Sequence, residues 1–276
     1  MAVPTNVVRV HPIERLRYVA RSAGAPQDVL VSETATALAA FRHDPSGLVT
    51  ACRRVVSRQV TAGALWWLCS RMLCAPEPMA EARAAVDEIE SDPTARALAG
   101  ALPSDATVLI VGWPSQIVPA LARRGDLDVL VGDGAGEGHS LAAHLEHRDV
   151  DADVVPMSGL ASAAAAADLV LLDAAAVGPD RFVASAGSWS AAAVARTAAV
   201  PTWLVAGVGR VLPARVIEVI AGRLDEMADP WELDDELVPL ALVDRVVGPA
   251  GLESPSDTLR RCDCPIAPEL FRADIT

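Results

Sequence analysis

Lysine is absent from the 276-residue chain, and all 23 of its basic residues are arginine. The chain therefore has neither a lysine that could form a Schiff base nor the lysine of a phosphate-binding P-loop. The formal net charge of −13 disfavours general nucleic-acid binding, because neutralising phosphates requires clustered basic side chains. The abundance of Ala, Gly, Val and Asp favours codon bias as the reason for the missing lysine, and adaptation to high salt is the alternative.

Long hydrophobic segments and an export signal are also lacking. The longest apolar run, residues 160–172, is interrupted by Asp168 and is too short and too rich in alanine to span a bilayer. No apolar stretch with a small-residue cleavage site follows the N-terminus, so we expect a cytoplasmic protein that does not bind membranes. Five irregularly spaced cysteines predict reduced thiols, with Cys69 and Cys74 in the core.

The pattern of apolar residues changes near Pro103. Before it, apolar residues recur at helical spacing and no segment resembles a strand. We predict six helices in this part, at residues 11–24, 25–43, 44–59, 61–73, 76–92 and 93–102. The third is predicted to be capped by Asp44. Residues 1–103 are thus expected to form an all-helical N-terminal domain.

After residue 103, short apolar runs alternate with helical stretches. Strands are predicted at 108–112, 128–131, 153–156, 169–173, 202–206 and 243–247, and helices at 115–124, 138–147, 159–167, 188–199 and 213–224. This alternation predicts an α/β fold in which a Rossmann-like domain with a mostly parallel sheet, residues 104–250, follows the helical domain. Residues 251–276 show no period and are predicted to form a tail that packs on the surface or contacts a partner.

Ligands of open α/β sheets bind beyond the carboxyl ends of the strands, so candidate site residues are sought there. Gly112 and Trp113 follow the first predicted strand, but no further glycines complete a dinucleotide fingerprint. Asp133 follows the second strand, where an acid would bind a ribose. The glycine-rich loop 132–139 offers backbone N–H groups to an anion. Its acids, Asp133 and Glu137, would repel phosphate and favour a simple tight connection.

The segment LLDAAAVGPDRFVASAGSWSAAAVAR, residues 171–196, carries the central question about function. It starts as a buried strand that ends in Asp173, and it ends as a helix opened by Gly187 and Ser188, with Ser188 as the expected N-cap. The loop between them contains Asp180 and Arg181 but is mostly alanine, without Lys, Asn or His. The loop is either an active site or the remains of one.

Clusters of metal-binding residue types are interpreted as structural. His139, His144 and His147 are close in sequence, but no third ligand from another element is evident, which favours a solvated helix face. Cys262 and Cys264 would need two more ligands to hold zinc. We therefore predict no metal site.

Other features are also interpreted as structural. The serines of the segment 185–190 lie in no G-x-S-x-G motif. Asp234 and Asp235 are predicted to lie in a solvated turn. Trp66 and Trp67 mark either the core of the helical part or an interface.

The order of these segments resembles a known family. ATVLIVGWPSQIV is similar to its first strand and turn, and LVGDGAGEGHSLAAHL to its second strand and loop. The block from ADLVLLDAAAV to PTWLVAG resembles its ligand loop and helix start, and DPWELDDELVPLALVDRVVGPAGL resembles its last strand. The family comprises the α, β and δ regulatory subunits of translation initiation factor 2B and the isomerases of methylthioribose 1-phosphate and ribose 1,5-bisphosphate. The resemblance implies a homodimer formed through the Rossmann-like half.

The same resemblance implies that the catalytic residues of the isomerases are missing. Gly112 stands in place of their cysteine, Asp133 in place of an arginine, and Ala175 in place of their catalytic acid. Ala184 and Ser185 lie where the isomerases carry an Asn-Lys pair. Proton transfer needs a positioned acid and base, and phosphate binding needs a fixed cation. The family-type isomerase activity is therefore not expected.

The leading hypothesis is a non-catalytic, initiation-factor-2B-like protein for ligand sensing or protein interaction, without a cofactor. Its crevice would bind a small nucleotide or sugar phosphate and would be lined by Gly112, Trp113, Asp133, Asp173, Asp180, Arg181, Gly187 and Ser188. An alternative is a sugar-phosphate isomerase with a rebuilt site, with Asp173 or Asp180 as acid or base and Arg181 as anion clamp. It predicts a crevice carboxylate with a perturbed pKa beside a charge partner. A third hypothesis is a nucleotide-cofactor-binding protein that holds a ribose through Asp133.

Overall fold

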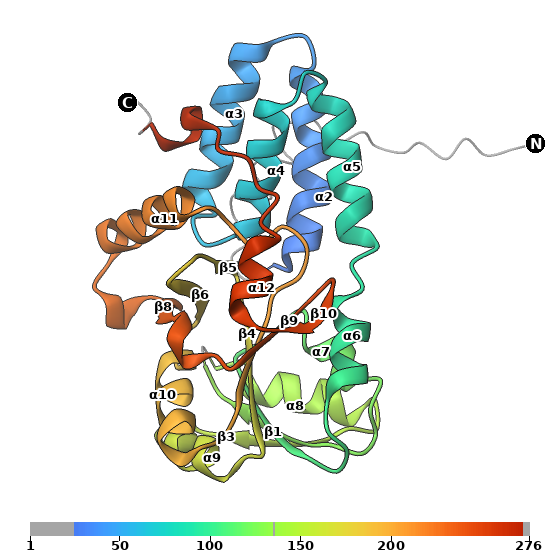
Figure 1. The fold of residues 1–276 in the computed structure, drawn as a ribbon, viewed down its shortest axis with the longest axis vertical. Coiled ribbons are helices and arrows are strands. Elements are labelled where there is room, and N and C mark those ends of the chain that lie inside the picture. The colour runs from blue at the N-terminus through green and yellow to red at the C-terminus, as the bar shows by residue number, and fades with distance from the viewer. Residues whose placement is uncertain (1–24, 135, 273–276) are drawn as a thin grey trace, which may run out of the picture.

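The computed structural model describes residues 25–134 and 136–272, so the predicted helix at 11–24 lies outside the described residues. In Figure 1 a group of helices stands above a sheet that is covered by further helices. The upper group and its connection to the sheet comprise α2 (Gln27–Leu38), α3 (Pro45–Arg58), α4 (Gly63–Cys74), α5 (Pro78–Glu90) and α6 (Thr94–Ala101). These helices confirm the predictions for residues 25–102. The Asp44 carboxylate accepts a hydrogen bond from Gly47 N and caps α3 as predicted.

The lower part contains a seven-stranded sheet of order β10-β9-β7-β4-β1-β2-β3. Its strands are β1 (Thr107–Val111), β2 (Asp128–Gly132), β3 (Asp151–Val155), β4 (Leu169–Asp173), β7 (Thr202–Val205), β9 (Arg245–Gly248) and β10 (Gly251–Glu253). All neighbouring strands pair in parallel except β9 and β10. The structure thus confirms the predicted helical region followed by a mostly parallel α/β fold.

Helices cover both faces of this sheet, which explains the continuous apolar sequence of its central strands. Leu109 and Val111 of β1 pack in a cluster with one pair of helices, whereas Val108 and Ile110 pack in another cluster on the opposite face. The first pair is α9 (Leu160–Ala166) and α10 (Ser188–Ala198); the second is α7 (Val118–Leu121) and α8 (Gly138–Glu146). The predicted helix at 115–124 is thus reduced to a single turn.

A second, three-stranded sheet was not predicted. It consists of β5 (Ala176–Val177), β6 (Arg181–Ser185) and β8 (Asp235–Pro239), in the order β5-β6-β8 with antiparallel pairs. The predicted solvated turn at Asp234 and Asp235 is wrong in part, because Asp235 pairs with Ser185 and is only partly exposed. The predicted N-cap Ser188 is also wrong. Gly187 is the N-cap of α10 with φ of 99°, and Ser188 is buried in the first turn.

The core of the helical part includes residues from the end of the chain. Trp66 and Trp67 are fully buried in it, so they are core residues. They pack with apolar residues of α11 (Ala214–Met227) and with Cys264, Ala267 and Leu270. The prediction that residues 251–276 form a tail on the surface is therefore wrong. The last described segment runs back across the helices (Figure 1) and buries side chains between them.

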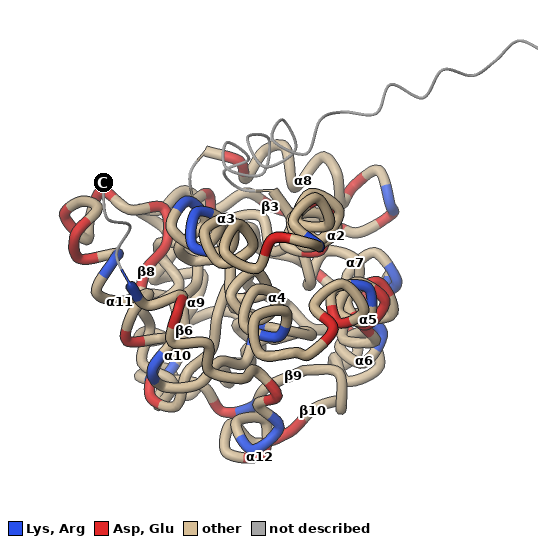
Figure 2. Tube along the Cα trace, turned by 90° about the horizontal axis from the view of Figure 1, so that it is seen from above, with Lys and Arg blue, Asp and Glu red and all other residues tan. Residues whose placement is uncertain are grey.

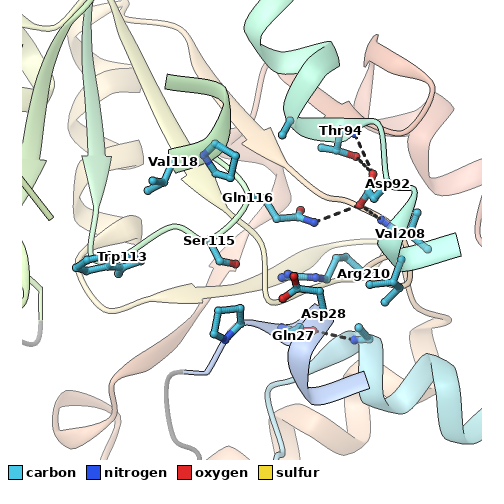
Figure 3. A pocket seen from close by; sticks show the side chains of 15 residues that line it. Gln27, Asp28, Asp92, Thr94, Trp113, Ser115, Gln116, Val118, Val208 and Arg210 are labelled. Atoms are coloured by element: carbon cyan, nitrogen blue, oxygen red, sulfur yellow. Dashed lines mark hydrogen bonds between the residues drawn. The ribbon is translucent and has the colours of Figure 1, made fainter. Parts of the chain in front are cut away.

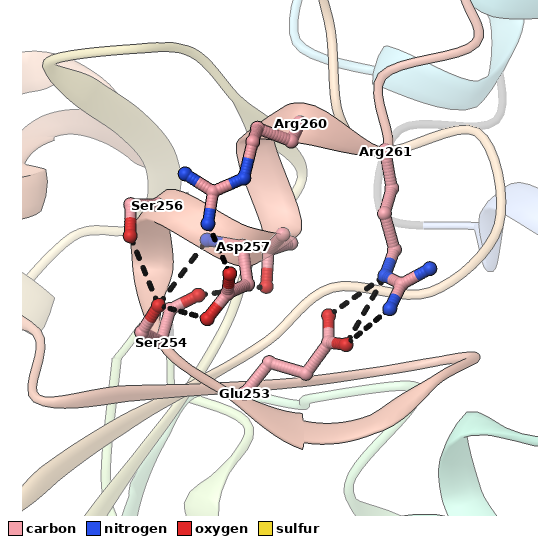
Figure 4. Close-up of polar contacts among 7 residues, drawn as sticks. Glu253, Ser254, Ser256, Asp257, Arg260 and Arg261 are labelled. Atoms are coloured by element: carbon pink, nitrogen blue, oxygen red, sulfur yellow. Dashed lines mark hydrogen bonds and ion pairs between the residues drawn. The ribbon is translucent and has the colours of Figure 1, made fainter.

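Polar contacts fix the start of this returning segment. Ser254 caps α12 (Pro255–Arg260) by accepting a hydrogen bond from Asp257 N, and its hydroxyl donates to the Asp257 carboxylate. Arg261 donates to both carboxylate oxygens of Glu253, as Figure 4 shows.

No helix of the described ranges has the length and apolarity needed to cross a membrane. In the view from above (Figure 2), acidic and basic residues both lie on the outer elements.

Candidate functional site

A cleft of about 300 Å³ lies where the helical part meets the loops that follow β1 and β7. Figure 3 shows side chains from separate stretches of the chain converging on it. They are Pro26, Gln27 and Asp28; Ala64; Ile89, Asp92, Thr94 and Ala95; Trp113, Ser115, Gln116, Val118 and Pro119; Val208 and Arg210. Because β1 and β7 both end here, the cleft occupies the edge of the sheet where α/β proteins bind ligands.

Asp92 fastens the loop after β7 to the helical part. One of its carboxylate oxygens accepts hydrogen bonds from the backbone N and hydroxyl of Thr94, at 2.9 and 2.5 Å. The other accepts from Val208 N at 2.9 Å and from Gln116 Nε2 at 3.3 Å. The Gln116 amide oxygen in turn accepts from Gly207 N at 2.7 Å. Both oxygens of Asp92 are thus used in shaping the cleft.

Gln27 fastens the other side of the cleft. Its Nε2 donates to the carbonyl of Ala175 at 3.0 Å, and its Oε1 accepts from Ala64 N at 2.9 Å. Gly63 N donates to the same Ala175 carbonyl at 3.0 Å. The N-terminal ends of α2 and α4 are therefore held against the loop after β4. Asp28, the next residue of α2, is exposed in the first turn and lines the cleft.

Arg210 places a buried cation in the cleft. The residue is 4% exposed, and its Nη1 donates to the Ala174 carbonyl. Among residues 25–134 and 136–272, no carboxylate oxygen lies within 4.0 Å of its guanidinium nitrogens. Burial lowers the pKa of Arg210, and the charges of Asp173, Asp92 and Asp28 oppose that shift. An arginine stays protonated in proteins, so the guanidinium is a fixed positive charge with donors left for a ligand.

Asp173, at the end of β4, lies directly behind this lining. Its Oδ2 accepts a hydrogen bond from Gln116 N at 3.2 Å. Its Oδ1 is enclosed and has no hydrogen-bond partner in the described part of the chain. Burial raises the pKa of Asp173, while Arg210 and hydrogen bonds from Gln116 and Ser115 act in the opposite direction. A buried acid beside a cation is the kind of pair that occurs at functional sites.

Of the eight predicted site residues, Trp113 lines the cleft and Asp173 lies behind it. Trp113 is 40% exposed, and its ring lies 5.5 Å from that of His144, at a tilted angle. Asp180 and Arg181 instead form an exposed ion pair at 2.7 Å at the start of β6, away from the lining. This contact lowers the pKa of Asp180, which makes it a poorer proton donor near neutral pH.

The remaining predicted residues are used in local structure. Asp133 Oδ1 accepts from Gly138 N at 2.8 Å at the start of α8. Gly112 packs beside Ser185. Gly187 and Ser188 open α10, where Glu236 of β8 accepts from Trp189 N at 2.7 Å. Backbone N–H groups at the start of α8 and α10 thus bind the chain's own carboxylates, as the helix dipole favours.

Sequence reasoning missed Arg210, Asp28 and Asp92. The only local signal for Arg210 is its position in a Gly-rich loop after a predicted strand, AGVGRVL. Asp28 and Asp92 belong to the helical part, which alone indicates no site. Among residues 25–134 and 136–272, no group of three His, Cys, Asp or Glu residues is placed to hold a metal ion. The five cysteines are free; Cys74 is exposed, contrary to prediction.

Comparison with known proteins gives no matching family model and no matching curated sequence. Solved structures do match. Translation initiation factor eIF-2B from Pyrococcus horikoshii OT3 superposes with a TM-score of 0.75 at 14% identity, over 93% of this chain and 100% of that one. The tetrameric eIF2B-β2-δ2 complex from C. thermophilum gives 0.74 at 16% identity, over 90% and 92%. The 5-methylthioribose 1-phosphate isomerase from P. horikoshii OT3 gives 0.61 at 13%, over 88% and 84%.

These matches confirm the predicted resemblance at the level of the fold. The chain has the architecture shared by the initiation factor 2B subunits and methylthioribose-1-phosphate isomerase, over nearly its whole length. Fold alone does not fix chemistry, so function has to be argued from the cleft.

Proposed function

We propose that the chain is a non-catalytic, initiation-factor-2B-like protein that binds a small phosphorylated metabolite, a sugar phosphate or a nucleotide, in the cleft around Arg210. The observation that carries the proposal is the Arg210 guanidinium, which is buried, lines the cleft and has no carboxylate partner among the described residues. A fixed guanidinium binds phosphate through two parallel hydrogen bonds.

Other lining groups suit the rest of such a ligand. The exposed carboxylate of Asp28 is an acceptor for sugar hydroxyls. The half-exposed ring of Trp113 offers an apolar face to a sugar or a base. The ligand would join the helical part to the sheet, since these groups come from both.

The non-catalytic part of the proposal rests on what stands at the positions implied by the resemblance. Ala175, in the place of the catalytic acid, has no acidic side chain, and its carbonyl accepts hydrogen bonds from Gln27 and Gly63. No cysteine or histidine of the described residues lines the cleft. The acids near Arg210 are Asp173, Asp92 and Asp28, and none of them stands at the position of the catalytic acid that the resemblance implies.

The test is isothermal titration and thermal shift with ribose 5-phosphate and AMP. We expect binding by the wild type and at least a tenfold loss for Arg210→Met, since a charged hydrogen-bond partner contributes roughly 1.5–3 kcal/mol. Arg215→Met is the matched control, because Arg215 is exposed on α11 and lies outside the cleft lining. Equal affinities for wild type and Arg210→Met would refute the role of Arg210.

A second candidate is a sugar-phosphate isomerase with rebuilt chemistry, favoured by the raised pKa of Asp173 beside Arg210. An acid whose pKa is raised is better suited to proton transfer than an ordinary aspartate. Incubating the protein with ribose 5-phosphate in D2O would reveal deuterium uptake next to the carbonyl by NMR. Uptake that disappears in Asp173→Asn would favour the enzyme; no uptake by a protein that binds the sugar phosphate would favour the sensor.

The proposal includes a homodimer in the cytoplasm, formed through the α/β part. It is supported by the match to an assembly of initiation factor subunits and by the exposed Trp189 and Trp231 on this part, at 47% and 81% exposure. Sedimentation velocity should show a dimer, and Trp189→Asp with Trp231→Asp should weaken it. A wild-type monomer at micromolar concentration would refute this part.

A further inference from the structure

The charges around the cleft are unbalanced in a way that a simple phosphate ester does not correct. Among the described residues, Asp28 and Asp92 line the cleft with Arg210 as the only cation, and Asp173 lies behind it. The lining thus carries one more negative than positive charge. A bound phosphomonoester adds roughly 1.5 to 2 further negative charges. An uncompensated ligand of this kind meets attraction at Arg210 and repulsion from the surrounding acids.

The two lining carboxylates differ in what they still offer. Both oxygens of Asp92 accept hydrogen bonds from the protein itself. Asp28 makes no hydrogen bond or ion pair within residues 25–134 and 136–272, and its carboxylate is exposed at the first turn of α2. In Figure 3 its side chain points towards Arg210 across the cleft. The Asp28 carboxylate and the Arg210 guanidinium therefore face each other across the cleft without forming an ion pair.

We infer that the ligand carries an ammonium group as well as its phosphate, with the phosphate on Arg210 and the ammonium on Asp28. The inference rests on the proposed function and specifies its ligand as a phosphorylated amine, of which an amino-sugar phosphate is one class. Two features of the described residues support it: the nine-tenths buried Arg210 has no carboxylate partner among them, and the exposed Asp28 that faces it makes no hydrogen bond or ion pair with them. Behind the lining, the enclosed Asp173 Oδ1 also lacks a hydrogen bond within the described ranges. An ammonium restores the charge balance that a neutral sugar leaves negative.

A matched pair of probes separates this inference from the proposed function. Glucose 6-phosphate and glucosamine 6-phosphate differ only in a hydroxyl replaced by an amine. We expect the amine to bind roughly fivefold tighter at low ionic strength and near-neutral pH, the range of an exposed ion pair. Added salt should reduce the preference, because exposed charges are screened.

Asp28→Asn should make the two probes bind equally, whereas Glu90→Gln should leave the preference intact. Glu90 is the control because it is an exposed acid at the end of α5, next to the lining residue Ile89 but outside the lining itself. Thermal unfolding of both variants checks that they fold. Equal binding of both probes by the wild type, or an unchanged preference in Asp28→Asn, would overturn the inference and leave the proposed function standing. The inference and the proposed function would both be overturned if neither probe binds and if Arg210→Met does not change the affinity for ribose 5-phosphate or AMP.

Discussion

Replacing Gly209 by alanine tests the contact between the cleft and the helical core. Gly209 precedes Arg210 and has φ of +74°, a conformation that disfavours residues with a side chain. A Cβ atom there would lie 2.9 Å from Cε3 of Trp67. The indole cannot retreat easily, because it is fully buried, donates to Asp263 Oδ1 at 3.0 Å, and lies 4.5 Å below the Arg71 guanidinium.

The expected loss of stability follows from two destabilising contributions and one smaller, stabilising contribution. An L-residue in the left-handed region costs about 1–2 kcal/mol. Forcing a methyl group into a packed core costs about 1–3 kcal/mol. Alanine recovers about 0.4–1 kcal/mol by restricting the unfolded chain. We therefore expect Gly209→Ala to lower the free energy of unfolding by about 1–5 kcal/mol, a large part of the roughly 5–15 kcal/mol of an ordinary domain.

The assay is urea denaturation followed by circular dichroism. Gly100→Ala is the matched control, because Gly100 lies in α6 and a Cβ there meets no atom within 4 Å. Alanine should stabilise that helix by about 0.5–1 kcal/mol, so the two substitutions should differ in sign. The reasoning is refuted if Gly209→Ala unfolds within about 0.5 kcal/mol of the wild type.

Three further measurements test other contacts. Gln27→Met should lower the free energy of unfolding by about 1–3 kcal/mol in the same urea assay, because two backbone groups at the cleft lose their partner; no change would contradict the bridging role. The Arg124 guanidinium lowers the pKa of Asp126 to about 2. Since the folded pKa is depressed, its stabilisation should be present above about pH 4 and lost as pH falls through about 2, which an NMR titration of wild type and Asp126→Asn would check. A thiol reagent should modify exposed Cys74 in the native protein but Cys264 only on unfolding, because burial raises the pKa of Cys264 to about 12; equal rates would contradict this packing.

Strong periodicity made most elements predictable. The helices from residue 25 to 101 and the parallel strands β1, β2, β4 and β7 follow from apolar spacing alone, because each buries a continuous face. The three-stranded sheet was missed for a physical reason. β6 pairs with β8, whose residues lie about fifty positions later in the chain, and β5 has only two residues. Nothing local in such short segments distinguishes a strand from a loop.

The site was predictable only in its location. Strand ends pointed to the edge of the sheet where the cleft lies, and Trp113 and Asp173 are found there. The residues that give the cleft its charge could not be found in this way. Asp28 and Asp92 come from the helical part, and the burial of Arg210 depends on how that part docks against the sheet. Side-chain burial of an isolated arginine has no signature in a single sequence.

The return of the chain to the helical part has a consequence for the order of folding. During synthesis α2 to α5 emerge first, yet their shared core also requires Ile217 and Ile220 of α11 and, last of all, Leu270. Until those residues leave the ribosome, apolar surface around Trp66 stays open to water and to chaperones. These helices are made before the sheet but are among the last elements to be completed, and a nascent chain halted before residue 264 should be protease-sensitive in helices that the finished protein protects.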